Sequence, residues 1–267
     1  MAAKLVLVTG ASSGIGEATA KRYGAGGAHV LLLARGAERL AAVAEAIRKT
    51  GGAATPYLID LSDAAAIAET AARIRRDCGL PDILINNAGA GRWLPLIETT
   101  AEDALRMIEV PYLAAFNLTR ALLPAMVARR SGAIAFVTSP ASYIAWPGAS
   151  AYIAARRAVA GLAETLQSEL RGTGLAVTLI VLGTVETPYW DHNPGSRETM
   201  PKSNPRLFPV MTADQAAGAI VEGVAERRAF VVKPAIYRVL FVLNALFPRL
   251  VASQIRRATG KPSTASS

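Results

Sequence analysis

The chain has 267 residues, 52% of them apolar, and carries a formal net charge of +9. This length is at the upper end for a single domain and allows a large buried core, so length and composition agree with one compact unit. The arginines are spread along expected helices without the interleaved aromatic residues of a stacking platform, so the charge does not predict nucleic-acid binding.

The chain begins with a strand, a glycine-rich loop and a helix. The apolar run from Lys4 to Val8 predicts a buried parallel strand, and from about Ile15 the apolar spacing is helical. In the segment TGASSGIG between them, Gly10 permits a tight turn, Gly14 lets the backbone approach a pyrophosphate, and Gly16 lets helix and strand pack closely. Phosphates would lie at the helix N-terminus, where free N–H groups and the helix dipole favour anions, whereas a purely structural turn would need no ligand. The residues predicted to hold a cofactor here are Thr9, Gly10, Ser12, Ser13, Gly14, Ile15 and Gly16.

The second expected strand, Ala28 to Ala34, ends where a dinucleotide site meets the adenosine ribose. An acidic residue there would bind a free 2′-hydroxyl, whereas arginine suits a 2′-phosphate. Here Arg35 follows the strand, and its fork-shaped cation can bind a phosphate bidentately. NADP(H) is therefore predicted over NAD(H), with an ordinary solvated arginine as the alternative.

Short apolar runs continue to alternate with helical stretches through the rest of the chain. Further strands are expected at 53–60, 82–85, 133–138, 176–182 and 229–232. This rhythm predicts an α/β fold, a Rossmann-type doubly wound parallel sheet of about seven strands flanked by helices. We expect one NADP-binding and catalytic domain over 1–234, an apolar and basic helical extension over 235–258, and a disordered tail over 259–267.

Further motifs complete a pattern that begins with the glycine segment: NNAG at 86–89, YLIDL at 57–61, and Ser139 thirteen residues before Tyr152. In this order and spacing they resemble the classical short-chain dehydrogenase/reductase family, from about residue 5 to residue 187. The resemblance implies that Ser139 holds a substrate carbonyl and that Tyr152 is the general acid and base. The cofactor contacts that it implies are Asp60 and Leu61 at the adenine, Asn87, Ala88 and Gly89 along the cleft, and Gly183, Val185 and Thr187 at the nicotinamide end.

The residue four positions after Tyr152 departs from the family pattern. Hydride transfer to a carbonyl carbon builds negative charge on oxygen, so a proton must reach that oxygen. A tyrosine hydroxyl, whose ordinary pKa is about 10, is helped by a nearby cation that stabilises the phenolate. In the family a lysine one helical turn away supplies this charge and also binds the nicotinamide ribose; here the residue is Arg156, which keeps the charge but is longer, planar and unable to release a proton. Either the arginine impairs the proton relay, or the site tolerates it. In the second case Arg156 only reflects the chain's general use of arginine in place of lysine.

A second departure concerns the asparagine by which many members complete a catalytic tetrad. The matching position is Pro111, which offers neither an amide side chain nor a backbone N–H, so the helix is expected to kink or admit water there. Leu182 also replaces a proline that many members have. Because acid–base assistance is worth about 10²–10⁴-fold in rate, an impaired relay would leave a slow enzyme, not necessarily an inactive one.

The substrate site is expected around segment 188–211, which follows the sixth strand and has the prolines and mixed polarity of a lid. Several large apolar residues either line a pocket or pack in a core or lid: Tyr189, Trp190, Leu207, Phe208, Trp93, Leu94 and Trp146. Since no fixed carboxylate-binding motif is evident, an apolar small molecule, a lipophilic ketone or secondary alcohol, is the favoured substrate.

The extension at 235–258 combines large apolar residues with Arg238, Arg249, Arg256 and Arg257. Its uncharged stretch around 239–247 is too short to cross a bilayer, which needs about 20 residues. We expect it either to pack on the domain or on a partner subunit of a homodimer or homotetramer, or to lie on a membrane surface with its arginines at anionic headgroups.

Cys78 is the only cysteine and no secretory signal is evident, so a cytoplasmic setting is expected, with membrane association as a variant. The histidines stand in no ligand cluster, so no metal site is expected. The predicted function is NADP(H)-dependent oxidoreduction, with Ser139, Tyr152 and Arg156 as the catalytic residues. The alternative is an NADP(H)-binding protein of low turnover that acts as a cofactor sensor or interaction protein.

Overall fold

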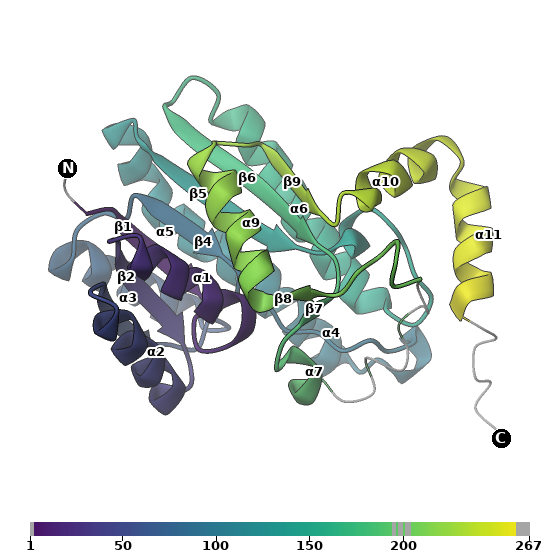
Figure 1. Ribbon diagram of the computed structural model, residues 1–267, viewed down its shortest axis with the longest axis horizontal. Coiled ribbons are helices and arrows are strands. Elements are labelled where there is room, and N and C mark those ends of the chain that lie inside the picture. The colour runs from purple at the N-terminus through teal and green to yellow at the C-terminus, as the bar shows by residue number, and fades with distance from the viewer. Residues whose placement is uncertain (1–2, 194–195, 197–199, 201–203, 260–267) are drawn as a thin grey trace.

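A parallel sheet runs through the middle of the protein (Figure 1). The computed structural model describes residues 3–193, 196, 200 and 204–259. Within these residues, seven strands form this sheet in the order β3-β2-β1-β4-β5-β6-β9, as the predicted doubly wound fold requires. The strands are β1 (Leu5–Thr9), β2 (His29–Ala34), β3 (Ala53–Leu58), β4 (Ile83–Asn86), β5 (Gly132–Thr138), β6 (Leu175–Leu182) and β9 (Phe230–Lys233).

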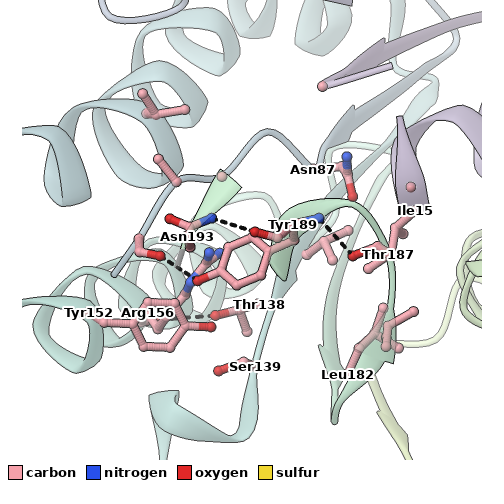
Figure 2. A pocket seen from close by; sticks show the side chains of 18 of the residues that line it. Ile15, Asn87, Thr138, Ser139, Tyr152, Arg156, Leu182, Thr187, Tyr189 and Asn193 are labelled. Carbon is pink, nitrogen blue, oxygen red and sulfur yellow. Dashed lines mark hydrogen bonds between the residues drawn. The ribbon is translucent and has the colours of Figure 1, made fainter. Parts of the chain in front are cut away.

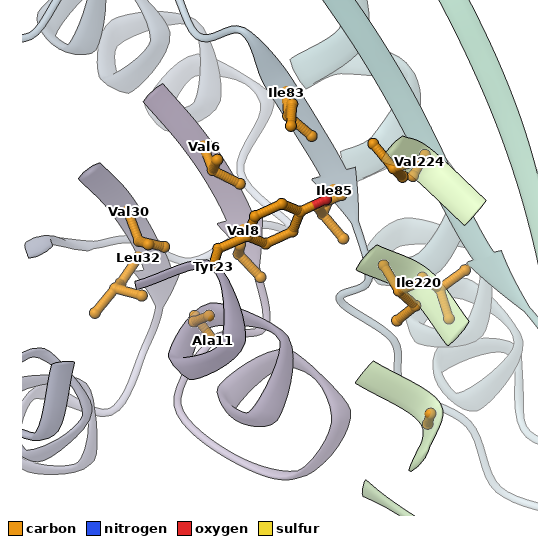
Figure 3. Packing of buried hydrophobic residues seen from close by; sticks show 14 of the residues in the cluster. Val6, Val8, Ala11, Tyr23, Val30, Leu32, Ile83, Ile85, Ile220 and Val224 are labelled. Atoms are coloured by element: carbon orange, nitrogen blue, oxygen red, sulfur yellow. The ribbon is translucent and has the colours of Figure 1, made fainter. Parts of the chain in front are cut away.

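Helices cover both faces of the sheet, which explains why its strands are continuous apolar runs. Side chains alternate along β1, so Val6 and Val8 belong to one core and Leu5 and Leu7 to the other. Figure 3 shows part of the first core, to which Tyr23 and Val8 both belong. This core includes residues of α1 (Gly14–Ala25), α2 (Ala37–Lys49) and α9 (Ala213–Ala225), and the second includes residues of α3 (Ala64–Asp77), α5 (Ala114–Arg129) and α6 (Ser150–Glu169).

The strand order changes direction between β1 and β4. Strands β2 and β3 extend the sheet on one side of β1, and β4, β5 and β6 extend it on the other. In open α/β sheets, ligands bind at the carboxyl ends of the strands beside such a switch point. The topology therefore brings the glycine loop after β1 and the turn after β4 to the same edge.

The helix that begins at α4 (Ala101–Ile108) is irregular around Pro111. It passes through a π-helical turn, Glu109–Leu113, before it continues as α5. Because proline cannot donate the regular backbone hydrogen bond, a wider turn accommodates it. The irregularity expected from Pro111 is confirmed.

The combined helical segment Ala101–Arg129 is long and apolar enough to cross a membrane on length and composition alone. Buried core helices also meet those criteria. In α5, Ala115, Leu118 and Leu122 belong to the second core, which accounts for much of the segment's apolar character.

Several short elements lie at the edge of the sheet where the glycine loop is located. Two two-residue strands, β7 (Val185–Glu186) and β8 (Met211–Thr212), pair with each other, and α7 (Tyr189–His192) follows β7. Two 3₁₀ turns lie at Leu96–Glu98 and Pro140–Ser142. None of these short elements has enough residues for a period of 2 or 3.6 to be recognised in the sequence.

The extension after β9 forms two helices, α10 (Ile236–Leu246) and α11 (Pro248–Thr259). The predicted single extension is thus divided at Phe247, because Pro248 has no N–H with which to continue α10 and is well placed at the first position of a new helix. In Figure 1 the two helices stand out from the sheet as an arm. Most of the predicted tail, residues 260–267, lies outside the described residues.

Candidate active site

The glycine loop brings the start of α1 close to the end of β1. Gly10 and Gly14 have φ of +66° and +55°, in the left-handed region that glycine tolerates best. A Cβ on Gly16 would lie 2.1 Å from the carbonyl oxygen of Gly10, so only glycine allows this approach. Ser13, at the N-cap of α1, makes no side-chain capping bond, and the first N–H groups of α1 can therefore face an anion.

Thr9, the last residue of β1, links the end of β1 to the end of β4 by hydrogen bonds. Its hydroxyl donates to the carbonyl oxygen of Ile85 at 3.2 Å and accepts from the N–H groups of Asn87 and Ala88, each at 2.9 Å. The Asn87 side chain donates in turn to the Thr9 carbonyl at 3.0 Å. Thr9 is buried and does not line the cavity, so the structure places it beneath the predicted cofactor site.

A cavity of about 1030 Å³ runs along this edge of the sheet. Every other residue predicted to bind the cofactor or take part in catalysis lines it, including Ser139, Tyr152 and Arg156 from one side and Thr187 from the other (Figure 2). A Cβ on Gly14 would lie 3.1 Å from the Cβ of Thr187, so the glycine loop and the segment after β6 nearly touch. The cavity therefore unites motifs that lie 177 residues apart in sequence, at Gly10 and at Thr187.

Arginines and an aspartate line the end of the cavity beside β2. Arg35 lies there as predicted, together with Arg39 from the first turns of α2. The Asp60 carboxylate accepts hydrogen bonds from the N–H and the hydroxyl of Ser62 at 3.0 and 2.9 Å. These bonds lower the pKa of Asp60, with a smaller contribution from the charge of Arg35. Arg39 was not predicted as a cavity residue. Its position four residues after Arg35, at the start of a helix, could have indicated that the two side chains lie on the same side.

Tyr152 and Arg156 lie one turn apart on α6, and each is only 8% exposed. The guanidinium carbon of Arg156 is 4.9 Å from the centre of the Tyr152 ring, a cation–π arrangement. Gly89 makes room for it, because a Cβ there would lie 2.8 Å from a terminal guanidinium nitrogen of Arg156. Among the described residues, Nε of Arg156 has no hydrogen-bond partner. The charge predicted beside Tyr152 is therefore present and buried.

Ser139 begins the 3₁₀ turn after β5 and lies near Tyr152 in Figure 2. Its hydroxyl oxygen accepts a hydrogen bond from the N–H of Ala141 at 3.1 Å, and the side chain is half-buried. The neighbouring hydroxyl of Ser142 donates to the carbonyl oxygen of Arg156 at 2.8 Å, which ties this turn to α6. The serine and the tyrosine are thus positioned by elements that are themselves hydrogen-bonded together.

Tyr189 connects the segment after β7 to the side of the cavity that carries Tyr152. Its hydroxyl donates to the carbonyl oxygen of Gly91 at 2.6 Å, and a Cβ on Gly91 would lie 2.5 Å from a ring carbon of Tyr152. Burial raises the pKa of Tyr189, and the nearby Tyr152 raises it further, so Tyr189 remains a hydrogen-bond donor at neutral pH. This contact spans 98 residues and has no signal in the sequence.

Aromatic side chains form the wall beyond Tyr152. The Trp93 ring lies 5.5 Å from that of Tyr152 and 6.1 Å from that of Trp146. Of the predicted pocket residues, Leu94 and Leu207 do not line the cavity, and Leu207 is exposed. The arm contributes residues that the pocket prediction left out: Tyr237, Leu240, Gln254, Ile255 and Ala258.

Comparison with known proteins agrees with this geometry. Residues 4–197 match the family model described as short chain dehydrogenase. An uncharacterized oxidoreductase of Mycobacterium tuberculosis is 38% identical over 229 residues, which cover 84% of this chain and 64% of that protein. A fatty acyl-CoA reductase of Acinetobacter baylyi is 34% identical over 226 residues, covering 84% of this chain and 74% of the relative. The chain thus matches a little under two thirds of the mycobacterial protein's length.

Solved structures match over nearly the whole chain. A short-chain dehydrogenase from Sphingobium yanoikuyae in complex with NADPH has a TM-score of 0.80 and 30% identity, covering 97% of this chain and 99% of that one. A short chain dehydrogenase/reductase from Burkholderia phymatum in complex with NAD has a TM-score of 0.83 and 25% identity, covering 98% of both chains. Because the family model covers well over half of the chain and a 34% identical relative is covered over 74% of its length, the chain belongs to the short-chain dehydrogenase/reductase family.

Proposed function

We propose that the protein is an NADP(H)-dependent oxidoreductase that transfers hydride between the nicotinamide and the carbonyl or hydroxyl carbon of a lipophilic ketone or secondary alcohol. The observation that carries this proposal is the buried pair Tyr152 and Arg156, which faces the same cavity as the glycine loop. A phenol, a fixed cation and a cradle for phosphates in one cavity are the groups that such a transfer needs.

The residues around the cavity fit a nicotinamide dinucleotide. The uncapped start of α1 and the close approach at Gly16 form a cradle for the pyrophosphate. Asn87, Ala88 and Gly89 also line the cavity, as do Gly183, Val185 and Thr187. When bound, the cofactor would supply or accept the hydride at C4 of its nicotinamide.

In the reductive direction, Tyr152 donates its hydroxyl proton to the substrate oxygen as negative charge develops there. Ser139 hydrogen-bonds the same oxygen and orients the carbonyl. Arg156 stabilises the phenolate that remains, because its fixed charge lies over the Tyr152 ring in a buried site. Arg156 does not carry the proton onward, since a guanidinium stays protonated at any accessible pH.

Arg35 and Arg39 support a preference for NADP(H). Both line the cavity next to the end of β2, and their forked cations suit a 2′-phosphate. No acidic residue occupies positions 34–36, the place from which a carboxylate would bind a free ribose 2′-hydroxyl. Among the similar structures are complexes with NADPH and with NAD, so the preference of this chain rests on its own arginines.

The composition of the cavity wall supports an apolar substrate. Trp93, Trp146, Met107, Phe208 and Leu240 all line the cavity, and the first three pack in one cluster with Tyr152. Two relatives are named for acyl substrates, the fatty acyl-CoA reductase and a 3-oxoacyl-[acyl-carrier-protein] reductase of Thermotoga maritima. The low-turnover sensor function is not favoured, since these relatives are named as enzymes.

The test is turnover with Tyr152→Phe as the comparison. NADPH oxidation against a panel of apolar ketones and aldehydes should fall by about 10²–10⁴-fold in kcat in the variant, because the proton donor is lost. NADPH binding should change only a few-fold, since the ring and its contacts remain. Equal turnover in both proteins would show that Tyr152 is not the acid.

A further inference from the structure

The arm formed by residues 235–259 has an inner face that packs against the rest of the protein. Tyr237 packs on Phe208 with ring centres 5.0 Å apart, and Phe241 packs on Tyr143 at 4.8 Å. Leu240, between them, lines the cavity. Asn244 anchors the end of α10 by donating to the carbonyl oxygen of Tyr143 at 3.0 Å. One side of α10 therefore packs on the rest of the protein and contributes to the cavity wall.

The opposite side of α10 is also apolar, and it faces outward. Val239, Val242, Leu243 and Leu246 repeat at helical spacing and are exposed, Val242 by 58% and Leu246 by 66%. Phe247 and Leu250 extend this exposed surface around the turn into α11. A helix on the surface of a water-soluble protein normally carries polar residues on its outer side, and contiguous apolar exposure marks a binding surface.

The charges on the arm favour an anionic partner. Residues 235–259 contain four arginines and no aspartate or glutamate. Arg238, Arg249 and Arg257 are exposed on the same two helices as the apolar surface. A second copy of this chain bound through the same face would bring two sets of arginines together without carboxylates from either arm to offset them. Anionic lipid headgroups offset these charges, and the acyl region below them accepts the apolar side chains.

We propose that the outer face of the arm binds the surface of an anionic lipid bilayer. The 11 residues of α10 rise about 16 Å, well short of the roughly 30 Å hydrocarbon core, so the helix lies in the plane of the interface. Since the inner face of the same helix lines the cavity, the cavity lies directly behind the surface that meets the lipid. Binding to lipid does not depend on hydride transfer, so the two proposals are tested separately.

The experiment is co-sedimentation of the full chain with vesicles of phosphatidylcholine alone or mixed with phosphatidylglycerol. The wild-type protein should sediment with the mixed vesicles, and at about 1 M salt, where the screening length falls to about 3 Å, binding should weaken severalfold. The double variant Val242→Glu with Leu246→Glu should bind the mixed vesicles at least about tenfold more weakly, because two apolar side chains are replaced by anions.

The matched control is Leu96→Glu with Ile97→Glu, which alters two apolar residues that are 73% and 92% exposed outside the arm. This control should bind vesicles like the wild type, and thermal unfolding verifies that both variants are folded. Failure of the folded wild-type protein to bind the mixed vesicles would overturn the proposal, as would an equal loss in the control variant. If light scattering instead shows an oligomer that the arm variant dissociates, without vesicle binding, a second copy covers the surface and the proposal is wrong.

Discussion

At the scale of single residues, the position of Arg156 depends on glycines in another segment. Gly89 leaves the space that its guanidinium fills, and Gly91 leaves space for the Tyr152 ring. The longer side chain at the position of the family's lysine is therefore accommodated by a glycine 67 positions earlier in the sequence. A buried guanidinium over an aromatic ring gains more electrostatic energy than an exposed pair does.

If this charge stabilises the Tyr152 phenolate, removing it must slow the chemical step. Arg156→Met should lower kcat at least about tenfold, whereas Arg156→Lys, which keeps the charge, should retain or exceed the wild-type kcat. The measurement is steady-state turnover with NADPH binding determined in parallel, so that effects on kcat and on binding are separated. A methionine variant with wild-type kcat would show that the charge has no catalytic use.

The sequence predicts which residues line the cavity better than how they contact one another. Arg35, Asn87 and Thr187 were found from motifs, because short motifs fix a local backbone and its chemistry. The hydrogen bond from Tyr189 to Gly91 and the buried role of Thr9 were not found, because each depends on which turns the sheet brings together. Such contacts are properties of the topology and have no local pattern.

At the scale of elements, close packing in the glycine loop determines where the start of α1 lies relative to the end of β1. Gly16 lies in the first turn of α1, and the Gly10 carbonyl occupies the place where its side chain would be. Any side chain at this position must push α1 away from β1 and displace the N–H groups that face the cavity.

Gly16→Ala should therefore weaken NADPH binding at least about tenfold, since even a 1 Å displacement of the helix start removes several hydrogen bonds to phosphate. Gly161 of α6 offers a matched control, because no atom lies within 4 Å of a Cβ built there. Gly161→Ala should leave binding unchanged and stabilise the protein by about 0.5–1 kcal/mol, the usual gain from replacing a helical glycine. Fluorescence titration and urea unfolding of both variants measure these effects, and equal binding by the two would refute the packing argument.

The elements that the sequence predicted are those buried on both faces. Strands such as β1 and β5 are continuous apolar runs, so their positions were correct to within one or two residues. Strand β3 ends at Leu58 and not at residue 60. Its last residue paired with β2 is Leu58, opposite Ala34, and Ile59 and Asp60 follow the strand. The division of the extension at Pro248 could have been predicted from proline's missing N–H.

At the scale of the whole molecule, buried tyrosines link stability to alkaline pH. Burial raises the pKa of Tyr23 and of Tyr189, and it raises the pKa of Tyr237 to about 12. Unfolded tyrosines lose their protons near pH 10, so above that pH the unfolded chain binds fewer protons than the folded one. The stabilisation is complete below about pH 9 and is lost as the pH rises through 10.

The free energy of unfolding should consequently fall by about 1.4 kcal/mol per tyrosine at pH 11, or roughly 4 kcal/mol for these three. Tyr23→Phe should make the measured fall smaller by about 1.4 kcal/mol, the share of one tyrosine. It should also stabilise the protein at neutral pH by about 1 kcal/mol, because the Tyr23 hydroxyl is buried without a hydrogen-bond partner among the described residues. Urea unfolding of both proteins at pH 8 and pH 11 measures these free energies. An identical loss of stability in the variant and the wild type would contradict the role given to Tyr23.

The most direct test of the proposed chemistry is to follow the hydride itself. The purified protein is incubated with NADPH carrying deuterium at C4 of the nicotinamide, and with a lipophilic ketone that supports NADPH oxidation in the panel. Mass spectrometry of the alcohol should find deuterium on the carbinol carbon, and the label should form much more slowly with Tyr152→Phe. Tight binding of NADPH with no labelled alcohol from any ketone of the panel would contradict the account and return the protein to the class of cofactor-binding proteins of low turnover.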